Sequence, residues 1–210
     1  MINMIERLKN KFGVNKPIFT SEILEEMSEF SRAYVFRLLK EAASKGELLK
    51  FEKGVYYVPT STMYGKSNLA LEQVISKKYI KDKDDVFGIY SGLMLKYNFS
   101  MTNQVPMTIE IITNNESTPI RRMKKDERTI VLRKSRTPIN KKNVYAYTIL
   151  ELFNNINLEQ YKKDKLVKKE ITQYISKNKI KAKDVLELAV KFPNKATKNI
   201  VESGIVNEFT

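Results

Sequence analysis

The first 59 residues carry apolar side chains at helical spacing in three successive segments and then change to a strand pattern. Steps of three and four residues predict helices over 2–12, 20–27 and about 31–45, with a turn between the second and the third. Residues 51–58 are strand-like on both sides of Gly54, which supplies the positive φ of a hairpin turn. Three helices and a hairpin in so short a segment have few ways to bury their apolar faces together.

That order of elements is the outline of a winged helix-turn-helix domain over residues 1–59. In such a domain the last helix enters the major groove of DNA, and the side chains of its first turns face the base edges. The candidate DNA-contacting residues lie off the apolar face of that helix or in the hairpin: Ser31, Arg32, Tyr34, Arg37, Lys40, Lys50 and Lys53. Winged helices also serve as protein–protein modules, and residues 1–59 have a net charge of only +2, so that interpretation stays open.

The formal charge of the whole chain is +14, from 38 basic and 24 acidic side chains. Residues 60–150 hold 16 basic and 8 acidic side chains, a net charge of +8, and residues 151–210 add +4. A strongly basic chain favours a polyanionic partner, which is nucleic acid first and an acidic protein or a membrane surface next. Most of the charge therefore lies outside the segment predicted to bind DNA.

The sequence contains no His, no Cys and no Trp. A Ser-His-Asp triad, a thiol nucleophile and a thiolate-bound metal are therefore excluded. Asp82 and Asp84 could form a carboxylate pair for two-metal chemistry, but the Gly-Ser turn that normally precedes such a pair is missing, which favours a solvated loop. We predict no catalytic residue, no metal site and no cofactor, and an enzyme acting on nucleic acid is only a third hypothesis. No apolar run approaches the roughly 18–20 residues that span a bilayer, so we expect a cytoplasmic protein without a membrane partner.

The remaining residues, 60–210, predict an α+β domain with a small antiparallel sheet over about 88–136 and several helices over about 140–205. Strands over 118–123 and 129–133 should pair antiparallel and carry a cluster of cations. On one face of the sheet these cations would form a basic surface, and a solvated face without a partner is the alternative. The cluster comprises Arg121, Arg122, Lys124, Lys125, Arg128, Arg133, Lys134 and Arg136.

Several short stretches of the sequence occur together in a known family. They are Lys53-Gly54-Val55-Tyr56-Tyr57-Val58-Pro59, Gly88-Ile89-Tyr90-Ser91-Gly92-Leu93, Thr102-Asn103-Gln104-Val105-Pro106 and Thr113-Asn114, followed by a helix that contains Asn143. Over residues 17–155 the chain resembles the AbiE-type antitoxin family of type IV toxin–antitoxin and phage-abortive-infection systems.

This resemblance implies a protein with two roles. The winged helix would repress the protein's own operon by binding inverted repeats in operator DNA, as a monomer or as a DNA-induced dimer. The second domain would neutralise a nucleotidyltransferase-like toxin, directly or indirectly, through the basic sheet and the helices after it. The alternative is a winged-helix transcriptional regulator whose second domain serves effector binding or dimerisation and has no antitoxin role.

Overall fold

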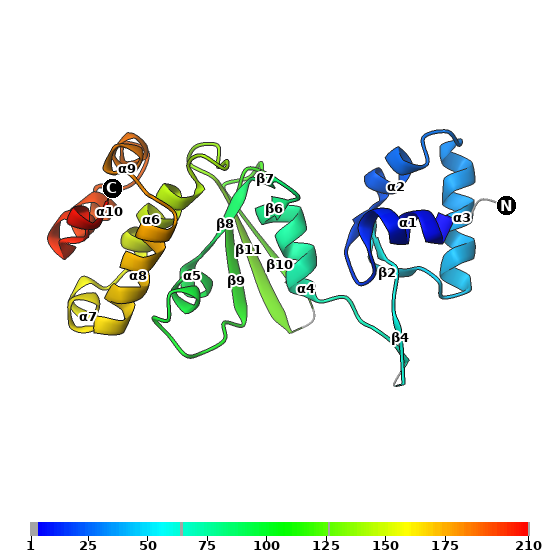
Figure 1. Ribbon diagram of the computed structural model, residues 1–210, viewed down its shortest axis with the longest axis horizontal. Coiled ribbons are helices and arrows are strands. Elements are labelled where there is room, and N and C mark those ends of the chain that lie inside the picture. The colour runs from blue at the N-terminus through cyan, green and yellow to red at the C-terminus, as the bar shows by residue number, and fades with distance from the viewer. Residues whose placement is uncertain (1–3, 64, 126, 210) are drawn as a thin grey trace. The chain divides into compact units, whose positions relative to one another are not determined.

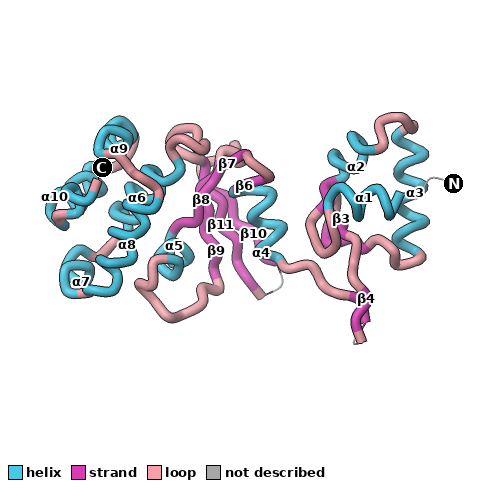
Figure 2. Tube along the Cα trace, in the orientation of Figure 1, coloured by secondary structure: helices cyan, strands magenta, loops and turns pink. Residues whose placement is uncertain are grey.

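The computed structural model describes residues 4–63, 65–125 and 127–209 (Figure 1). It is a mixed α+β structure with 49% helix and 20% strand, which confirms the predicted α+β class. The chain divides into two compact units, residues 1–77 and residues 78–210, and each is described by itself. In Figure 2 the long strands of the second unit stand together as one sheet, with helices of the same unit beside them.

Over residues 4–57 the first unit has three helices and a hairpin in the predicted order, and a short strand that was not predicted, β1, completes a three-stranded antiparallel sheet. Its elements are α1 (Met4–Phe12), β1 (Ile18–Phe19), α2 (Thr20–Glu26), α3 (Arg32–Ser44), β2 (Leu49–Glu52) and β3 (Val55–Tyr57). The strands lie in the order β1-β3-β2. Leu8, Ile23, Val35 and Leu48 are fully buried in one core. The helical spacing of the sequence identifies the first three of these, because each lies on the inward face of its own helix.

The first unit extends beyond the hairpin of β2 and β3. A small hairpin of β4 (Ser61–Thr62) and β5 (Gly65–Lys66) follows, and α4 (Leu71–Ile75) continues into a π-helical turn, Ser76–Ile80. The Lys77 ammonium donates to the carboxylate of Glu22 at 2.7 and 2.8 Å and to the carbonyl of Pro17 at 2.9 Å. These bonds attach Lys77 to the first turn of α2 and to the segment before it.

The second unit is built on a four-stranded sheet. Its strands are β8 (Gly88–Ser91), β9 (Thr108–Thr113), β10 (Ile120–Lys125) and β11 (Arg128–Lys134), in the spatial order β10-β11-β9-β8. The β8–β9 and β10–β11 pairs are antiparallel, whereas β11 lies between β9 and β10 and runs parallel to β9. A separate two-stranded hairpin, β6 (Lys81–Asp82) and β7 (Asp85–Val86), precedes this sheet.

The parallel pair corrects the expectation of a purely antiparallel sheet, and burial explains it. Ile130, Val131 and Leu132 of β11 are consecutive and all buried, so both faces of this strand need cover. In contrast, β10 is mostly exposed and rich in cations, which suits the edge of a sheet. When β11 takes the inner place it must run parallel to β9, because β10 reverses the chain between them.

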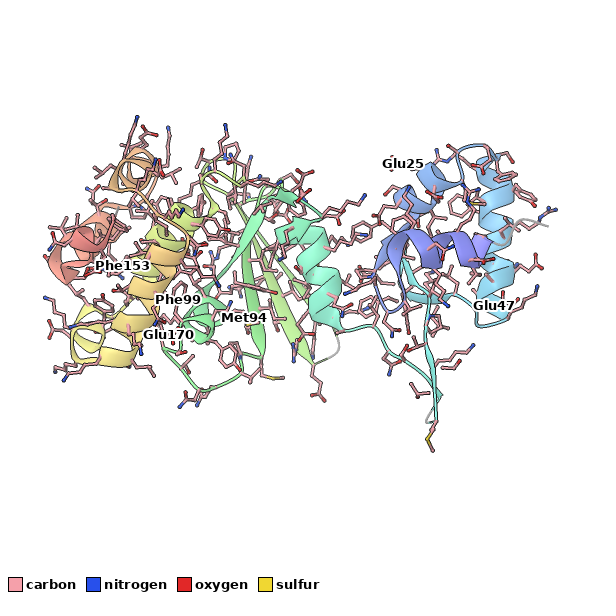
Figure 3. The ribbon with its side chains drawn as sticks, in the orientation of Figure 1. Glu25, Glu47, Met94, Phe99, Phe153 and Glu170 are labelled. Carbon is pink, nitrogen blue, oxygen red and sulfur yellow. The ribbon has the colours of Figure 1, made fainter. Side chains whose placement is uncertain are left out.

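The helices of the second unit pack around one central helix, α6 (Val144–Asn155). One of them, α5 (Gly92–Asn98), lies between β8 and β9 in the chain. The others follow α6: α7 (Leu158–Lys163), α8 (Lys165–Lys177), α9 (Ala182–Ala189) and α10 (Asn194–Ser203). Every residue of α6 from Ala146 to Phe153 is buried. Phe99 and Phe153, labelled in Figure 3, lie in the core that this helix shares with its neighbours. A helix buried on all sides needs other elements around it, and the later helices supply them.

One charged side chain, Glu151 of α6, is enclosed in this core with 4% of its surface exposed. Its Oε1 accepts hydrogen bonds from Ser91 Oγ at 2.7 Å and from Asn155 Nδ2 at 2.8 Å. Its Oε2 is buried and has no hydrogen-bond partner among the described residues. Burial raises the pKa of this carboxyl, because the charged form loses its hydration and the bonds from Ser91 and Asn155 only partly compensate.

We predict that Glu151→Gln stabilises the protein at neutral pH. A carboxyl with a raised pKa binds more protons in the folded than in the unfolded state, so its contribution to stability falls as the pH rises through that pKa. The amide keeps an acceptor for Ser91 and Asn155 and removes the buried charge. Urea denaturation at about pH 7.5 should show a free energy of unfolding higher by about 1 kcal/mol, and the gain should shrink at about pH 4. A variant less stable than the parent at the higher pH would contradict this.

Candidate nucleic-acid interface and basic surfaces

The start of α3 is fixed by a capped turn. Ser31 is the N-cap, and its hydroxyl accepts a hydrogen bond from the backbone N–H of Tyr34 at 3.3 Å. The backbone N–H of Phe30 donates to the carbonyl of Met27 at 2.9 Å, and the Phe30 ring packs against the Tyr34 ring with centroids 5.3 Å apart. The first turn of α3 is therefore held in a defined position after α2.

The outward face of α3 carries three exposed cations: Arg32, Arg37 and Lys40. Tyr34 is half-buried, and the guanidinium carbon of Arg37 lies 4.9 Å from the centroid of its ring. This cation–π contact orients Arg37 along the helix surface. In the part of the chain that the structure describes, no ion pair involves any of the three cations. Their charge is therefore available to an external anion.

The low net charge of residues 1–59 conceals this surface, because several carboxylates of the first unit are neutralised elsewhere. Four of them form ion pairs with cations that lie off the outward face of α3. The pairs are Glu22–Lys77, Glu26–Arg7, Glu26–Lys11, Glu29–Arg7 and Glu41–Lys45. The positive charge that is left is concentrated on α3 and on the hairpin.

The hairpin of β2 and β3 carries the other two predicted contact residues, Lys50 and Lys53, and both are exposed. Gly54 at the tip has a φ of +83°, a conformation that side chains disfavour. The carbonyl of Gly54 accepts a hydrogen bond from the backbone N–H of Thr20 at 2.9 Å. This bond anchors the tip to the start of α2, so the lysines stand on a fixed hairpin.

Sequence reasoning missed two residues of the outward face, Ala33 and Phe36, which are both exposed, Phe36 to 46%. Residues 32, 33, 36, 37 and 40 form one continuous stripe at the spacing of a single helix face. The signal that could have found Phe36 is its position four residues after Arg32 and four before Lys40.

The cations expected on one face of the sheet are divided between two faces. Neighbouring residues on a strand point to opposite faces, whereas residues paired across strands share a face. One face, here called the α6 face because its Ser91 bonds to Glu151, carries Arg122, Lys124 and Arg133. The other, here called the pocket face, carries Arg121, Lys125, Arg128 and Lys134. The prediction of a single basic face is therefore wrong.

Arg136 lies outside both faces, in the segment that leads from β11 to α6. Its guanidinium carbon is 5.4 Å from the centroid of the Phe192 ring, and its backbone N–H donates to the Tyr147 hydroxyl at 2.9 Å. The side chain of Arg136 thus packs on the helical part of the unit and belongs to neither basic surface of the sheet.

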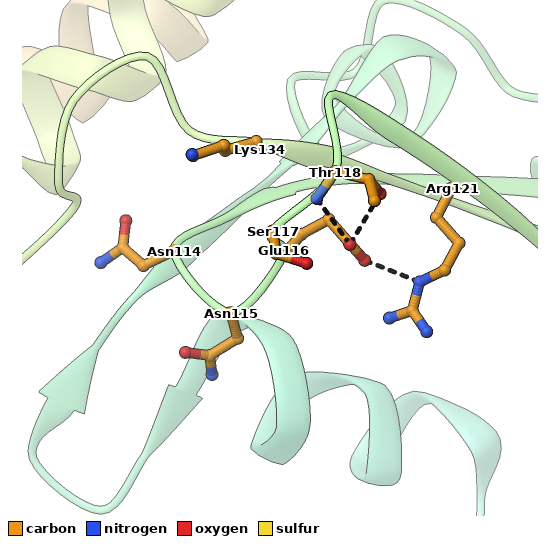
Figure 4. A pocket seen from close by; sticks show the side chains of 7 residues that line it. All are labelled: Asn114, Asn115, Glu116, Ser117, Thr118, Arg121 and Lys134. Atoms are coloured by element: carbon orange, nitrogen blue, oxygen red, sulfur yellow. Dashed lines mark hydrogen bonds and ion pairs between the residues drawn. The ribbon is translucent and has the colours of Figure 1, made fainter.

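A pocket of about 510 Å³ lies at the end of the pocket face (Figure 4). The loop from β9 to β10 forms most of its wall, and two cations of the sheet complete it. The lining residues are Asn114, Asn115, Glu116, Ser117, Thr118, Arg121 and Lys134. The sequence analysis assigned no function to the loop residues 114–118. Asn114 was named only as part of a stretch that carries the family resemblance.

Glu116 organises this wall from a buried position, with 4% of its surface exposed. Its Oε1 accepts hydrogen bonds from the Thr118 backbone N–H at 3.1 Å and the Thr118 hydroxyl at 2.8 Å, and its Oε2 accepts from Arg121 Nε at 2.7 Å. Burial alone would raise the pKa of Glu116, but these donors outweigh burial and hold the pKa below its usual value. The carboxylate therefore stays ionised and fixes Arg121.

The carboxylate pair Asp82 and Asp84 lies in the hairpin of β6 and β7, and the Asp84 side chain is 95% exposed. Within the described ranges, no three His, Cys, Asp or Glu residues are grouped so that they could hold a metal ion. Among the same residues, no helix combines the length and the apolar surface that crossing a bilayer requires.

The sequence matches no family model and none of the curated proteins with which it was compared. What the chain does is therefore inferred from its own geometry and from the resemblance carried by the short stretches described above.

We predict that Ser31→Ala lowers the free energy of unfolding by about 1 kcal/mol, because the Tyr34 N–H loses its acceptor at the start of α3. Ser31→Asn, which keeps an acceptor at the N-cap, should unfold like the parent. Urea denaturation measures both. If both variants lose the same free energy of unfolding, the Ser31 hydroxyl does not stabilise the protein by capping α3.

Proposed function

We propose that the first unit is a winged helix-turn-helix domain that binds operator DNA, and that the chain is an AbiE-type antitoxin that represses its own operon. The observation that carries the DNA-binding half is the outward face of α3, where Arg32, Arg37 and Lys40 are exposed and form no ion pair with the described residues. The hairpin of β2 and β3 takes the place of the wing.

In this proposal α3 lies in the major groove and reads bases through its first two turns. Arg32 stands in the first turn and Arg37 in the second, and each guanidinium can bond two acceptors of a guanine. In the absence of DNA the Arg37 side chain is already restricted by stacking on Tyr34. Less side-chain entropy is therefore lost when Arg37 binds a base. Phe36, exposed between them, offers the apolar contact that a thymine methyl accepts.

Lys50 and Lys53 on the anchored hairpin have a different role in this proposal. They contact phosphates of the neighbouring groove, which sets the position of the domain on the duplex without reading sequence. Phosphate contacts release counterions, so operator binding should weaken steeply as salt is added.

The antitoxin half of the proposal rests on the resemblance, and the sheet of the second unit supports it. Two stretches that carry the resemblance, 88–93 and 113–114, are distant in sequence but adjacent in space, since Gly88 pairs with Thr113 in the β8–β9 ladder. The exposed cations of the sheet suit an acidic surface on a partner. We take that partner to be a nucleotidyltransferase-like toxin of the same operon.

The pocket of the second unit favours a second candidate function, a transcriptional regulator that binds an effector and has no antitoxin role. Co-expression with the neighbouring gene separates the two candidates. A neighbour that is harmless alone, or that stays toxic beside this chain, would remove the antitoxin half and leave the regulator.

The DNA-binding half predicts that Arg32→Ala combined with Arg37→Ala weakens operator binding by roughly thirtyfold or more, since each lost base contact costs roughly 1–3 kcal/mol. A gel-shift titration with the DNA upstream of the gene measures this. Lys183→Ala combined with Lys198→Ala is the matched control, because it removes the same charge from exposed positions on α9 and α10. Undiminished binding by the arginine variant would show that α3 does not read the operator.

The antitoxin half predicts that Arg122→Ala combined with Lys124→Ala impairs rescue of cells that express the toxin, while operator binding is retained. Both side chains are exposed on the α6 face, so their loss should change the surface and not the core. Growth on co-expression measures rescue, and Lys9→Ala combined with Lys16→Ala, at exposed positions of the first unit, controls for total charge. Full rescue by the first variant would exclude the α6 face as the toxin-binding surface.

A further inference from the structure

We propose that the pocket of the second unit binds a small phosphorylated ligand of the sugar-phosphate class. The pocket is a hollow of about 510 Å³ that is open to solvent, which leaves room for more than a lone phosphate ion. The site lies wholly within residues 78–210 and is independent of the surface of α3.

The position of the pocket follows from the topology of the sheet. β9 and β11 are parallel, so their carboxyl ends lie at the same edge, where Asn114 follows one strand and Lys134 ends the other. The chain leaving β9 passes around the end of β11 to reach β10, whereas the chain leaving β11 passes toward α6, beside β8. These two connections therefore cross near the ends of β9 and β11, where Ser135 and Ile139 bond to Asn114, and the pocket is bounded by the β9–β10 loop and by Lys134 at the end of β11.

The wall of the pocket is preformed by hydrogen bonds. The Asn114 side chain accepts from the Ser135 hydroxyl and from the backbone N–H of Ile139, both at 2.8 Å, and donates to the carbonyl of Ile139 at 2.7 Å. The Asn115 amide donates to the carbonyl of Lys78 at 3.0 Å. Because the loop is already ordered without a ligand, ligand binding loses less conformational entropy than it would with a flexible loop.

The charge of the pocket selects an anion. Arg121 and Lys134 stand on either side of Ser117 in Figure 4, and Glu116 is the one carboxylate among the lining residues. Both oxygens of Glu116 are engaged by Thr118 and Arg121, so its charge is balanced within the wall. Lys134 is exposed and, within the described chain, forms no ion pair. A guanidinium and a free ammonium are the groups that bind phosphate oxygens.

The remaining lining groups indicate what the phosphate is attached to. The Oδ1 of Asn115 and the hydroxyl of Ser117 have no hydrogen bond in the described part of the structure, and both can pair with hydroxyl groups. The lining residues include no aromatic side chain, so the pocket offers no surface on which a base could stack. A phosphorylated sugar satisfies both conditions.

Titration calorimetry on the full chain tests this with ribose 5-phosphate, ribose and inorganic phosphate as probes. We expect ribose 5-phosphate to bind one per chain, inorganic phosphate to bind more weakly and ribose to give no binding. Lys134→Gln should weaken ribose 5-phosphate binding by about tenfold, because a charge-assisted bond is lost. Lys198→Gln on α10 removes the same charge far along the chain and should leave binding unchanged. Ser117→Ala should weaken ribose 5-phosphate more than phosphate.

Three results would overturn the proposal. Absence of ribose 5-phosphate binding, or equal affinity for phosphate and ribose 5-phosphate, would remove the sugar-phosphate class. Unchanged binding by Lys134→Gln would place the ligand elsewhere. Displacement of ribose 5-phosphate by duplex DNA of unrelated sequence, abolished in Lys134→Gln, would make the pocket a contact for nucleic-acid phosphates instead. These titrations use the purified chain without toxin or operator, so failure of the pocket proposal is distinguishable from failure of operator binding by α3 or of toxin neutralisation.

Discussion

The need to bury both faces of β11 determines the organisation of the second unit. Three consecutive apolar residues, Ile130 to Leu132, can be covered on both sides only inside a sheet. That place makes β11 parallel to β9, sends the β9–β10 loop around its end and divides the cations of the two strands between opposite faces. The pocket and both basic surfaces are therefore consequences of where one short apolar run is buried.

The sequence predicts the local elements better than it predicts their pairing. Apolar spacing places the inward residues of α3, and Gly54 marks the hairpin turn, because both signals lie within one element. The order β10-β11-β9-β8 has no comparable signal in the sequence. A sheet in which β9, β10 and β11 are neighbours in chain order would have the same strand patterns as the observed sheet, in which β11 lies between β9 and β10, and only long-range contacts distinguish the two. The pocket was missed for the same reason: Lys134 and Asn115 belong to one wall only once β11 lies beside β9.

Net charge was also an incomplete guide to the candidate DNA interface. Residues 1–59 carry only +2, yet ion pairs within the first unit neutralise Glu26 and Glu29, away from the outward face of α3. Screening in salt limits the reach of surface charges to about 10 Å, so a ligand responds to the charges near it and not to the sum over a domain. Phe36 shows the complementary case, in which an apolar residue completes a mostly charged stripe.

The exposed edge strand β10 has a consequence for the solution behaviour of the protein. An uncovered strand offers unpaired backbone groups to any other extended chain, and Lys and Arg side chains on such a strand hinder that association. The cations of β10 therefore hinder edge-to-edge pairing of the sheet and are also candidate binding groups. They are Arg121, Arg122, Lys124 and Lys125. Variants that remove these charges therefore lose a barrier to self-association as well as a candidate contact. The oligomeric state of each variant must be measured before a loss of binding is assigned to the lost contact.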